Sequence, residues 1–512
     1  MGAPVLPLAA PMALLAMLLA PHARAEIKVV PAVDLSATYT DNVRLEADET
    51  KHGQFITELS PSLSLSSNTP RLKLRAVLAT HLYAYLGGKV DGTNNSSREL
   101  SADARATLVD ELLYFDGGAS IGQQSNSAFG PQANNNGYAN ANRSEVRTWR
   151  ASPYLKHHFG ATAEAELRYT RDSVHSGNQG FADSTGDSVA LTIASGPTFH
   201  TLGWGALYNR QDVDDSLGRK SRAESAELNL RLRLTSDFSL KGALGYDRYD
   251  FGEFGGKTAG PSRSVGFLWA PSLRTSIDAS VGKRYFGNSY ALTALHHSRH
   301  TVWNVNYSDG VTTSRAEFLG TAQVSTAALL DRLFVATYPN AQERRQAVDA
   351  YMLATGLPPT VPDKINTFTN RFLLQKQWQA AVAFNGSRST AVFALNAVER
   401  RALSTQSFDS QLLGSALLGL NDDVRQISAT LSTNYRISPR SGINLVLNKA
   451  RTQSLSTGLE GNQTLVSAAV TRQFLRNIKG SVQLRHAQGA VGITGQQQYR
   501  ENAISASLSY QL

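Results

Sequence analysis

Hydrophobic and polar residues alternate with a period of two along most of the chain. Between positions 503 and 512, one parity carries Ile, Ala, Leu, Tyr and Leu, whereas the other carries Ala, Ser, Ser, Ser and Gln. Successive side chains of a β-strand point to opposite faces, so this segment is predicted to be a strand with one apolar and one polar face. A strand of a water-soluble sheet would alternate in the same way. The segment alone therefore does not separate a soluble sheet from a membrane barrel.

The same alternation recurs in many segments separated alternately by short turns and long polar loops. The predicted strands span 33–40, 54–66, 71–86, 98–109, 113–123, 143–158, 160–172, 186–199, 203–212, 222–234, 238–250, 262–270, 274–285, 289–298, 301–318, 366–386, 389–401, 424–437, 441–452, 462–474, 478–488 and 498–512. This pattern is typical of a transmembrane antiparallel up-and-down β-barrel, all-β in class, with about 22 strands (range about 18–22).

In such a barrel the short turns face the periplasm, the long loops face outside, and apolar side chains contact lipid. Both chain termini are then expected at the periplasmic end. Six aromatic residues are predicted to lie at the membrane edges: Phe238, Trp269, Trp303, Tyr307, Tyr435 and Tyr510. The alternative, a soluble β-sandwich or solenoid, would bury the same apolar faces. It should show larger residues and a fixed repeat, and neither is evident.

Composition narrows the class of protein further. The chain has no cysteine, which excludes disulfides and thiolate-based metal or redox chemistry. The hydrophobic share of 41% and the mean hydropathy of −0.25 argue against a helical membrane protein. No segment after residue 25 has the ~18 consecutive apolar residues of a spanning helix. The formal net charge of +9 is compatible with nucleic acid, a membrane surface or an acidic polymer as a partner.

Residues 1–25 have the features of a cleavable export signal. The apolar core Met12–Ala20 is too short to span a membrane, and Ala23 and Ala25 supply small side chains before the cleavage point. We predict cleavage after Ala25, which leaves residues 26–512 as the barrel. A buried N-terminal helix is the alternative, and the four prolines within 1–25 disfavour it.

One insertion interrupts the strand pattern. Residues 325–356 show helical spacing of apolar side chains, with Leu329, Leu330 and Leu333 in one stripe and Val348 and Met352 in a second. The insertion, bounded at about 322–360, should enter from the outer side of the barrel. Two placements stay open: a plug or cap over the lumen, and a helical hairpin packed on the exterior loops.

Cations concentrate on the polar parity of strands near their short-turn ends. Nine residues are candidate contacts for an anion or an acidic polysaccharide in the lumen: Arg71, Lys73, Arg75, Arg231, Arg233, Lys241, Arg274, Arg436 and Lys479. Arg168, Arg284 and Arg485 are expected farther up. A ring of cations on low-dielectric walls attracts anions. The alternative is that these cations merely pair with lumen carboxylates such as Glu164, Glu166, Glu227 and Asp278.

No enzymatic, cofactor or metal site is predicted. No GxSxG, HExxH or phosphate-binding glycine loop stands out in the sequence. Adjacent histidines such as His296 and His297 should point to opposite faces of a strand, so they are poorly placed to share a metal ion. The basic residues are spread over many strands without an aromatic RNA-binding motif, which disfavours nucleic acid as a partner.

Several strings in the sequence resemble a known family. They are ELRYTRDSV at 166–174, SGP at 195–197, LGWG at 202–205, RYFGNSYAL at 284–292, TVW at 301–303, QAVDA at 346–350 and ENAISASL at 501–508. Together they resemble the outer-membrane β-barrel family associated with PEP-CTERM/exosortase systems. The resemblance implies a Gram-negative outer-membrane protein encoded with machinery for exopolysaccharide production and protein sorting, and it implies no defined molecular activity.

The sequence therefore predicts an outer-membrane barrel that takes part in exopolysaccharide export or assembly as a channel with a basic lumen. The expected partners are outer-membrane lipid, an anionic polysaccharide and periplasmic export components. A general porin-like diffusion channel is the first alternative. An outer-membrane hydrolase or envelope-modifying enzyme, with Ser and His on the barrel wall, is the second.

Overall fold

The computed structural model describes residues 27–512, apart from 134, 140–141, 179, 253–255, 321–323, 326–329, 332–343, 345–347, 349–359, 362–367, 414 and 492–496. The predicted signal at 1–25 and most of the predicted insertion at 322–360 lie outside these residues. Within the insertion, Leu330, Asp331, Arg344 and Val348 are helical. Its two ends meet where Val324–Ser325 pairs with Thr360–Val361.

The described chain is built almost entirely of antiparallel strands. Its elements are β1 (Lys28–Thr40), β2 (Gln54–Asn68), β3 (Leu72–Leu86), β4 (Ser96–Val109), β5 (Leu113–Ser125), β6 (Arg143–Phe159), β7 (Ala163–Ser176), β8 (Ser184–Ser195), β9 (Leu202–Asp215), β10 (Lys220–Arg233), β11 (Phe238–Asp250), β12 (Lys257–Ser272), β13 (Thr275–Arg284), β14 (Gly287–His297), β15 (Thr301–Thr312), α2 (Ser314–Leu319), β16 (Val324–Ser325), β17 (Thr360–Val361), β18 (Leu373–Asn385), β19 (Ser389–Ala402), η1 (Gln406–Asp409), α5 (Ser410–Leu413), η2 (Ser415–Asn421), β20 (Asp423–Ser438), β21 (Ser441–Ser454), β22 (Glu460–Leu475), β23 (Ile478–Val491) and β24 (Gln497–Gln511).

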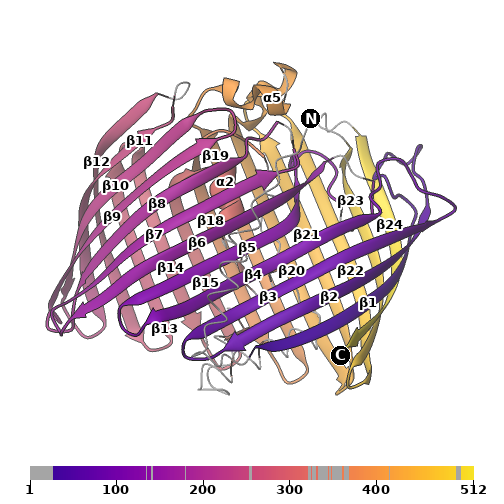
Figure 1. The fold of residues 1–512 in the computed structure, drawn as a ribbon, viewed down its shortest axis with the longest axis horizontal. Helices are drawn as coiled ribbons and strands as arrows, with labels where there is room; N and C mark the ends of the chain where they lie inside the picture. Colours follow the sequence, from indigo (N-terminus) through magenta and orange to yellow (C-terminus); the bar gives the residue numbers. More distant parts are fainter. Residues whose placement is uncertain are drawn as a thin grey trace.

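Twenty-two of these strands form one closed ring, which confirms the predicted barrel. Each strand pairs with its neighbour in sequence, and β15 pairs with β18 across the long connection. The first and last strands close the sheet, with register from Ala32 opposite Gln511 to Thr40 opposite Ala503. Because every strand edge is paired, the barrel leaves no row of unsatisfied backbone groups within a membrane. Figure 1 shows the strands running obliquely around the barrel.

The two ends of the barrel differ as predicted. One end carries only short connections, such as 273–274 between β12 and β13 and 439–440 between β20 and β21. The other end carries the long ones, including 126–142, 313–372 and 403–422. The start of β1 and the end of β24 lie at the short-turn end, so both ends of the ring face the periplasm (Figure 1).

Strand register assigns every side chain to the lumen or to lipid. Partners in an antiparallel register share a face, and alternate residues change face. Helix α2 contacts Asp172 of β7 and Arg400 of β19 from within the ring. The even-numbered residues of these two strands therefore face the lumen. On β24 the polar parity faces inward and Ile504, Leu508 and Tyr510 face outward. The apolar faces are therefore not turned onto a shared dry core, and the soluble sandwich is excluded.

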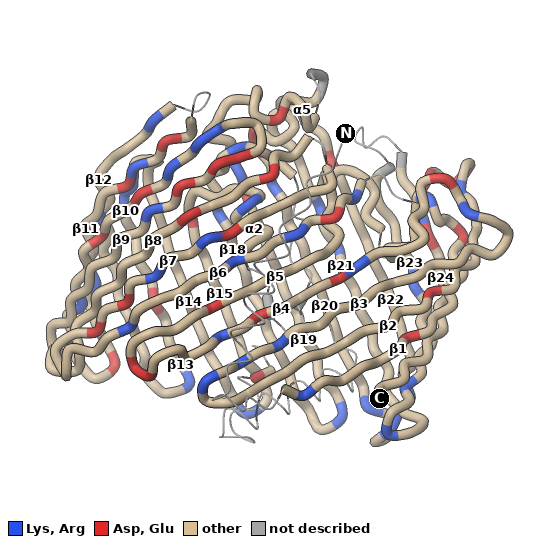
Figure 2. The backbone as a smooth tube through the Cα atoms, viewed as in Figure 1, with Lys and Arg blue, Asp and Glu red and all other residues tan. Residues whose placement is uncertain are grey.

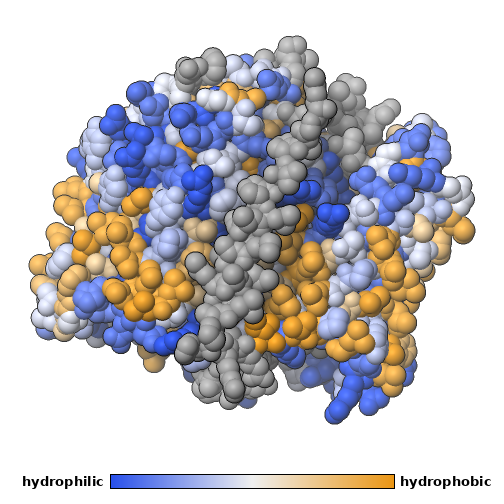
Figure 3. Space-filling view, viewed as in Figure 1, coloured by the Kyte–Doolittle hydropathy of each residue, from blue (hydrophilic) through white to orange (hydrophobic). Residues whose placement is uncertain are grey.

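The outward side chains form an apolar band. On β10, Leu228 and Leu230 are 66% and 55% exposed on the outer wall, although both are large and apolar. All six aromatic residues predicted at the membrane edges also have the outward parity. Figure 3 shows hydrophobic residues in a band across the lower half of the visible face, with hydrophilic residues above it. Such an extensive exposed apolar surface requires lipid. The chain is an outer-membrane β-barrel.

Several strand boundaries differ from the predicted ones. The first strand begins at Lys28 instead of residue 33. The strand predicted over 301–318 ends at Thr312, and Ser314–Leu319 form helix α2, because the Thr313 hydroxyl accepts a hydrogen bond from the Ala316 amide and caps a helical turn. The strand predicted from residue 366 begins only at Leu373. Among the described residues, no helix is long and apolar enough to cross a membrane.

Candidate functional site

Seven of the nine candidate cations face the lumen near its periplasmic end. By register they are Lys73, Arg75, Arg231, Arg233, Lys241, Arg436 and Lys479. They lie on β3, β10, β11, β20 and β23, which are distributed around the ring. The other two differ from the prediction, since Arg71 and Arg274 lie in turns at the periplasmic rim. Arg71 there forms an ion pair of 2.9 Å with Asp110 of a neighbouring turn.

Arg231 and Lys241 are brought directly together. They are cross-strand partners on β10 and β11. The Lys241 ammonium pairs with Asp278 of β13, one of the carboxylates considered in the sequence. Arg231 is exposed to the lumen, and within the described part of the chain no ion pair joins it to a carboxylate. Because Asp278 neutralises Lys241 but not Arg231, the position keeps one positive charge that attracts an anion.

Cations farther up the lumen are paired. Arg168 lies 2.9 Å from Asp116 and 2.9 Å from Glu166, and its guanidinium stacks over the Tyr154 ring at 3.8 Å. Arg284 makes two bonds of 2.9 Å to Asp247. Figure 2 shows charges of both signs interspersed along the halves of β7 to β12 nearest the long loops. Among the described residues, the lumen cation Arg231, which has no carboxylate partner, thus lies nearer the periplasmic end than the paired Arg168 and Arg284.

Small side chains create a hollow above the Arg231–Lys241 pair. A cavity of about 610 Å³ opens on the inner wall of β9–β15, with Ser262, Ser264 and Ser280 in its lining. Two of its glycines cannot be replaced without strain: a Cβ at Gly266 would lie 2.3 Å from the carbonyl oxygen of Ala279, and a Cβ at Gly282 would lie 2.4 Å from that of Arg263. Lacking side chains, this wall exposes backbone and hydroxyl groups to the lumen, which suits close approach of a ligand.

The adjoining wall is polar but nearly uncharged. Inward side chains on β18–β21 are mainly amides and hydroxyls. They bond to one another, as in the contacts from Gln377 to Asn396 (3.3 Å), Asn434 to Asn444 (2.6 Å) and Asn448 to Thr430 (2.7 Å). Such groups can exchange hydrogen bonds with a hydroxyl-rich molecule without holding it by charge.

Helix α2 spans the outer mouth of the lumen. Its Arg315 forms a buried ion pair with Asp172 of β7 and donates to Ser184 of β8 at 2.8 Å. Its Glu317 accepts two bonds of 2.8 Å from Arg400 of β19. Going round the ring, β19 is ten strands from β7 in one direction (β8 to β15, then β18 and β19) and therefore twelve of the 22 in the other. The helix thus connects nearly opposite walls.

A second closure involves the loop 126–142 between β5 and β6. The Tyr138 hydroxyl donates to the buried carboxylate of Glu501 at 2.6 Å, and Glu501 also pairs with Arg485 at 2.9 Å. Tyr138 packs there in a cluster with Tyr83, Tyr499, Val43, Leu45, Ile56 and Ala487. The loop therefore folds inward over β1–β3 and β23–β24.

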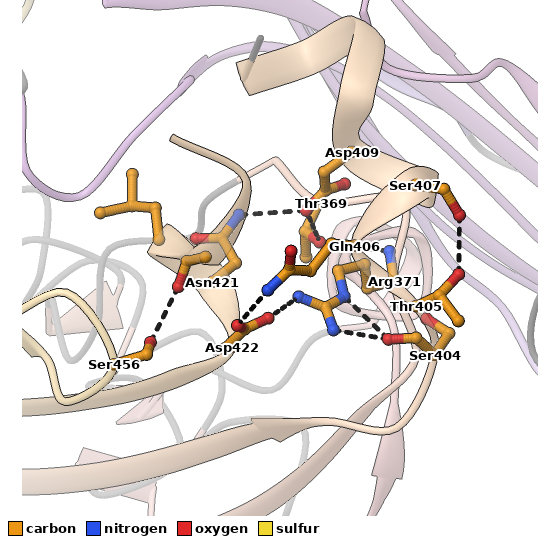
Figure 4. Close-up of polar contacts among 12 residues, drawn as sticks. Thr369, Arg371, Ser404, Thr405, Gln406, Ser407, Asp409, Asn421, Asp422 and Ser456 are labelled. Carbon is orange, nitrogen blue, oxygen red and sulfur yellow. Dashed lines mark hydrogen bonds and ion pairs between the residues drawn. The ribbon is translucent and has the colours of Figure 1, made fainter. Parts of the chain in front are cut away.

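Polar contacts attach the loop 403–422 to the segment that precedes β18, as Figure 4 shows. Arg371, just before β18, pairs with Asp422 and donates to the Ser404 carbonyl oxygen at 3.1 Å. The fully buried Asp409 accepts bonds of 2.7 Å from the Thr369 hydroxyl and from the Asn370 amide. Burial raises the pKa of Asp409 above its ordinary value, despite these bonds.

Sequence reasoning missed the bridging residues of the mouth. The pairs Arg315–Asp172 and Glu317–Arg400 join residues 143 and 83 positions apart, and no local pattern records such contacts. One signal was available: Thr313 and Ser314 followed by Glu317 is typical of a helix start. The sequence also indicated the small-residue hollow, since the inward-facing positions between 260 and 266 are Gly, Ser, Ser and Gly.

Comparisons with known proteins identify similar barrels. No family model and no curated protein matches the sequence. Among solved structures, the chain is similar to the siderophore receptor PirA from Pseudomonas aeruginosa (10% identity, TM-score 0.45, covering 96% of this chain and 81% of that one). It is also similar to the FrpB iron transporter from Neisseria meningitidis (10% identity, TM-score 0.49, 94% and 81%) and to the ferric-catecholate import receptor Fiu from E. coli K12 (8% identity, TM-score 0.47, 94% and 81%). At these identities the likeness is one of fold alone.

Proposed function

We propose that this barrel conducts an acidic polysaccharide across the outer membrane, as part of exopolysaccharide export or assembly. The observation that carries the proposal is the placement of Arg231 directly opposite Lys241 at the periplasmic end of the lumen, with Arg231 lacking a carboxylate in the described residues. Lys241 already pairs with Asp278, so an anionic group at this position would neutralise Arg231. A barrel of 22 strands also matches the size of outer-membrane transporters with a plugged lumen.

Two further features favour a polysaccharide over a small anion. The hollow on β9–β15 and the amide-rich wall of β18–β21 face the lumen along its length, and both present hydrogen-bonding groups that match sugar hydroxyls. The basic residues at the entrance are mostly exposed, so their attraction to each acidic group is screened and weak enough to allow release. The resemblance to the exopolysaccharide-associated family agrees with this class of substrate.

The bridge that α2 forms at the outer mouth favours a gated channel over the general porin-like channel. A diffusion pore needs a mouth that is open at rest, whereas α2 connects β7 with β19 through two buried ion pairs. The proposal therefore includes an opening step in which α2 leaves at least one wall.

The test in cells is deletion of the protein. Export predicts loss of surface polysaccharide with acidic polymer accumulating in the periplasm. Normal surface polymer would contradict export and favour the general channel. Hydrolysis of lipid or sugar by the purified protein would favour the enzyme.

The test in vitro uses the purified barrel in planar bilayers with polygalacturonate oligomers added on the periplasmic side. We expect anion selectivity and current blocks that the double variant Arg231→Gln, Lys241→Gln makes much rarer. The matched control is Arg71→Gln, Arg274→Gln, which removes the same charge from the turns. Cation selectivity, or equal block by neutral dextran, would refute the basic entrance.

A further inference from the structure

Two cations also oppose each other on the outer, lipid-facing wall. Arg263 of β12 and Lys283 of β13 are cross-strand partners. They share the outward parity of Val265 and Val281, which are 65% and 49% exposed. Both cations are exposed, and neither forms an ion pair with a carboxylate of the residues described by the structure. Their mutual repulsion is uncompensated by protein groups.

Several outward cations elsewhere on the barrel have a carboxylate partner. Arg425 of β20 pairs with Glu399 at 3.1 Å, Arg451 of β21 pairs with Glu460 at 2.6 Å, and Lys257 pairs with Asp250 at 3.1 Å. These contacts show that the outer wall can accommodate carboxylates beside its cations. The Arg263–Lys283 position instead offers two donors to a ligand outside the protein.

The cation pair lies at the extracellular edge of the apolar band. On β12 the outward residues below Arg263 are Val265, Phe267 and Trp269, all exposed and apolar. Above the pair, the connection from β13 to β14 consists only of residues 285–286, so no long loop of this hairpin rises over it. This height corresponds to the headgroup layer of the outer leaflet.

An apolar groove lies beside the cation pair. It has a volume of about 360 Å³ on the outer face of β8–β11, with small residues Ala206 and Ala226 between the larger Tyr208 and Tyr246. Leu244, which also lines it, is the cross-strand partner of Arg263. A groove of this kind accommodates a hydrocarbon chain, and its wall adjoins the site of positive charge.

We propose that the outer face of β8–β13 binds one molecule of lipid A, the phosphorylated and multiply acylated lipid of the outer leaflet. Its phosphate bridges Arg263 and Lys283, and one acyl chain occupies the groove between Tyr208 and Tyr246. The guanidinium suits a phosphate because it donates two parallel hydrogen bonds, while the ammonium adds a compact charge. The phosphate removes the repulsion between the two cations. This binding is independent of what passes through the lumen.

The test measures lipid A binding to the purified, folded full-length barrel in detergent by native mass spectrometry. Folding of each variant is verified by the heat-dependent shift of its migration in SDS gels. The double variant Arg263→Gln, Lys283→Gln should weaken lipid A binding by at least about tenfold, since it removes two charge-assisted contacts. The single variant Lys283→Gln should give a smaller loss, and Ala226→Phe should weaken binding by filling the groove.

The matched control is Arg425→Gln, Arg451→Gln, which removes the same two charges from outward positions that already have carboxylate partners. It should bind lipid A as the unmodified protein does. An equal loss in the control would overturn the site. Equally tight binding of dephosphorylated lipid A would overturn the phosphate contact, and equally tight binding of phosphatidylglycerol would overturn the assignment to lipid A.

Discussion

The ion pair between α2 and β19 provides a quantitative test of the closed mouth. Glu317 and Arg400 have side chains that are only 6% and 8% exposed, and they are joined by two contacts of 2.8 Å. Removing one partner of such a buried pair leaves the other charge uncompensated, which typically costs about 3–5 kcal/mol. The variant Glu317→Gln leaves Arg400 with its 2.8 Å bond to Gln375, but without a carboxylate from α2. Undocking of α2 should become correspondingly easier.

Hydrogen–deuterium exchange of α2 measures this change. The Glu317 amide donates to the Thr313 carbonyl at 3.1 Å, and the Gly320 amide donates to the Ala316 carbonyl at 2.9 Å. When closing is faster than exchange, their exchange rates follow the population of the open state. At about 1.4 kcal/mol per factor of ten, exchange should accelerate by between about a hundredfold and a few thousandfold. Single-channel openings should become more frequent in the same variant.

Two controls make the reasoning refutable. Glu399→Gln removes an outward carboxylate that pairs with the half-exposed Arg425 at 3.1 Å, a change expected to cost no more than about 1 kcal/mol. Adding Arg400→Met to Glu317→Gln should restore part of the lost protection, because a buried ion pair can be replaced by apolar groups at little cost. If Glu317→Gln and Glu399→Gln accelerate exchange in α2 equally, the helix is not held across the mouth by this pair.

Two other predictions concern pH and packing. Partial burial favours the neutral form of Asp41. Bonds from the Asn502 amide (2.7 Å) and side chain (3.0 Å), together with the Lys51 ammonium at 3.3 Å, outweigh burial and lower the pKa of Asp41. A lowered pKa stabilises the folded barrel above the ordinary carboxyl pKa of about 4, and this contribution is lost as pH falls through the lower folded value. The thermal unfolding temperature should therefore decline between pH 6 and 3, and Asp41→Asn should make that decline smaller. An identical decline in that variant would contradict the prediction. Gly266→Leu should lower the free energy of unfolding, measured with urea in lipid, by about 1–3 kcal/mol or more, because the new side chain contacts the Ala279 carbonyl. Gly242→Ala should change this free energy little, since its Cβ would lie 4.0 Å from its nearest neighbour. Equal effects of the two variants would show that close strand packing at Gly266 does not restrict the side chain there.

The sequence predicted the inner wall less completely than the outer wall. Parity placed Lys73, Arg231 and Lys241 inward, because a period of two depends only on local backbone geometry. It did not identify which cations would have carboxylate partners. Lys241 is 37 residues from Asp278, and their contact depends on the register of three strands. The cap was beyond sequence reasoning for the same reason, since Arg371 meets Asp422 only after two long connections fold back over the ring.

By itself, the sequence determined that this chain forms a barrel of about 22 strands, with apolar faces outward, short turns at one end and long loops at the other. These properties follow from the alternation of side chains and from turn residues, which act over a few positions. The tertiary structure decided that α2 connects β7 with β19, that Tyr138 reaches Glu501, and that Arg263 faces Lys283 beside an apolar groove. Those contacts join distant segments, so they depend on ring closure and register and not on any local pattern.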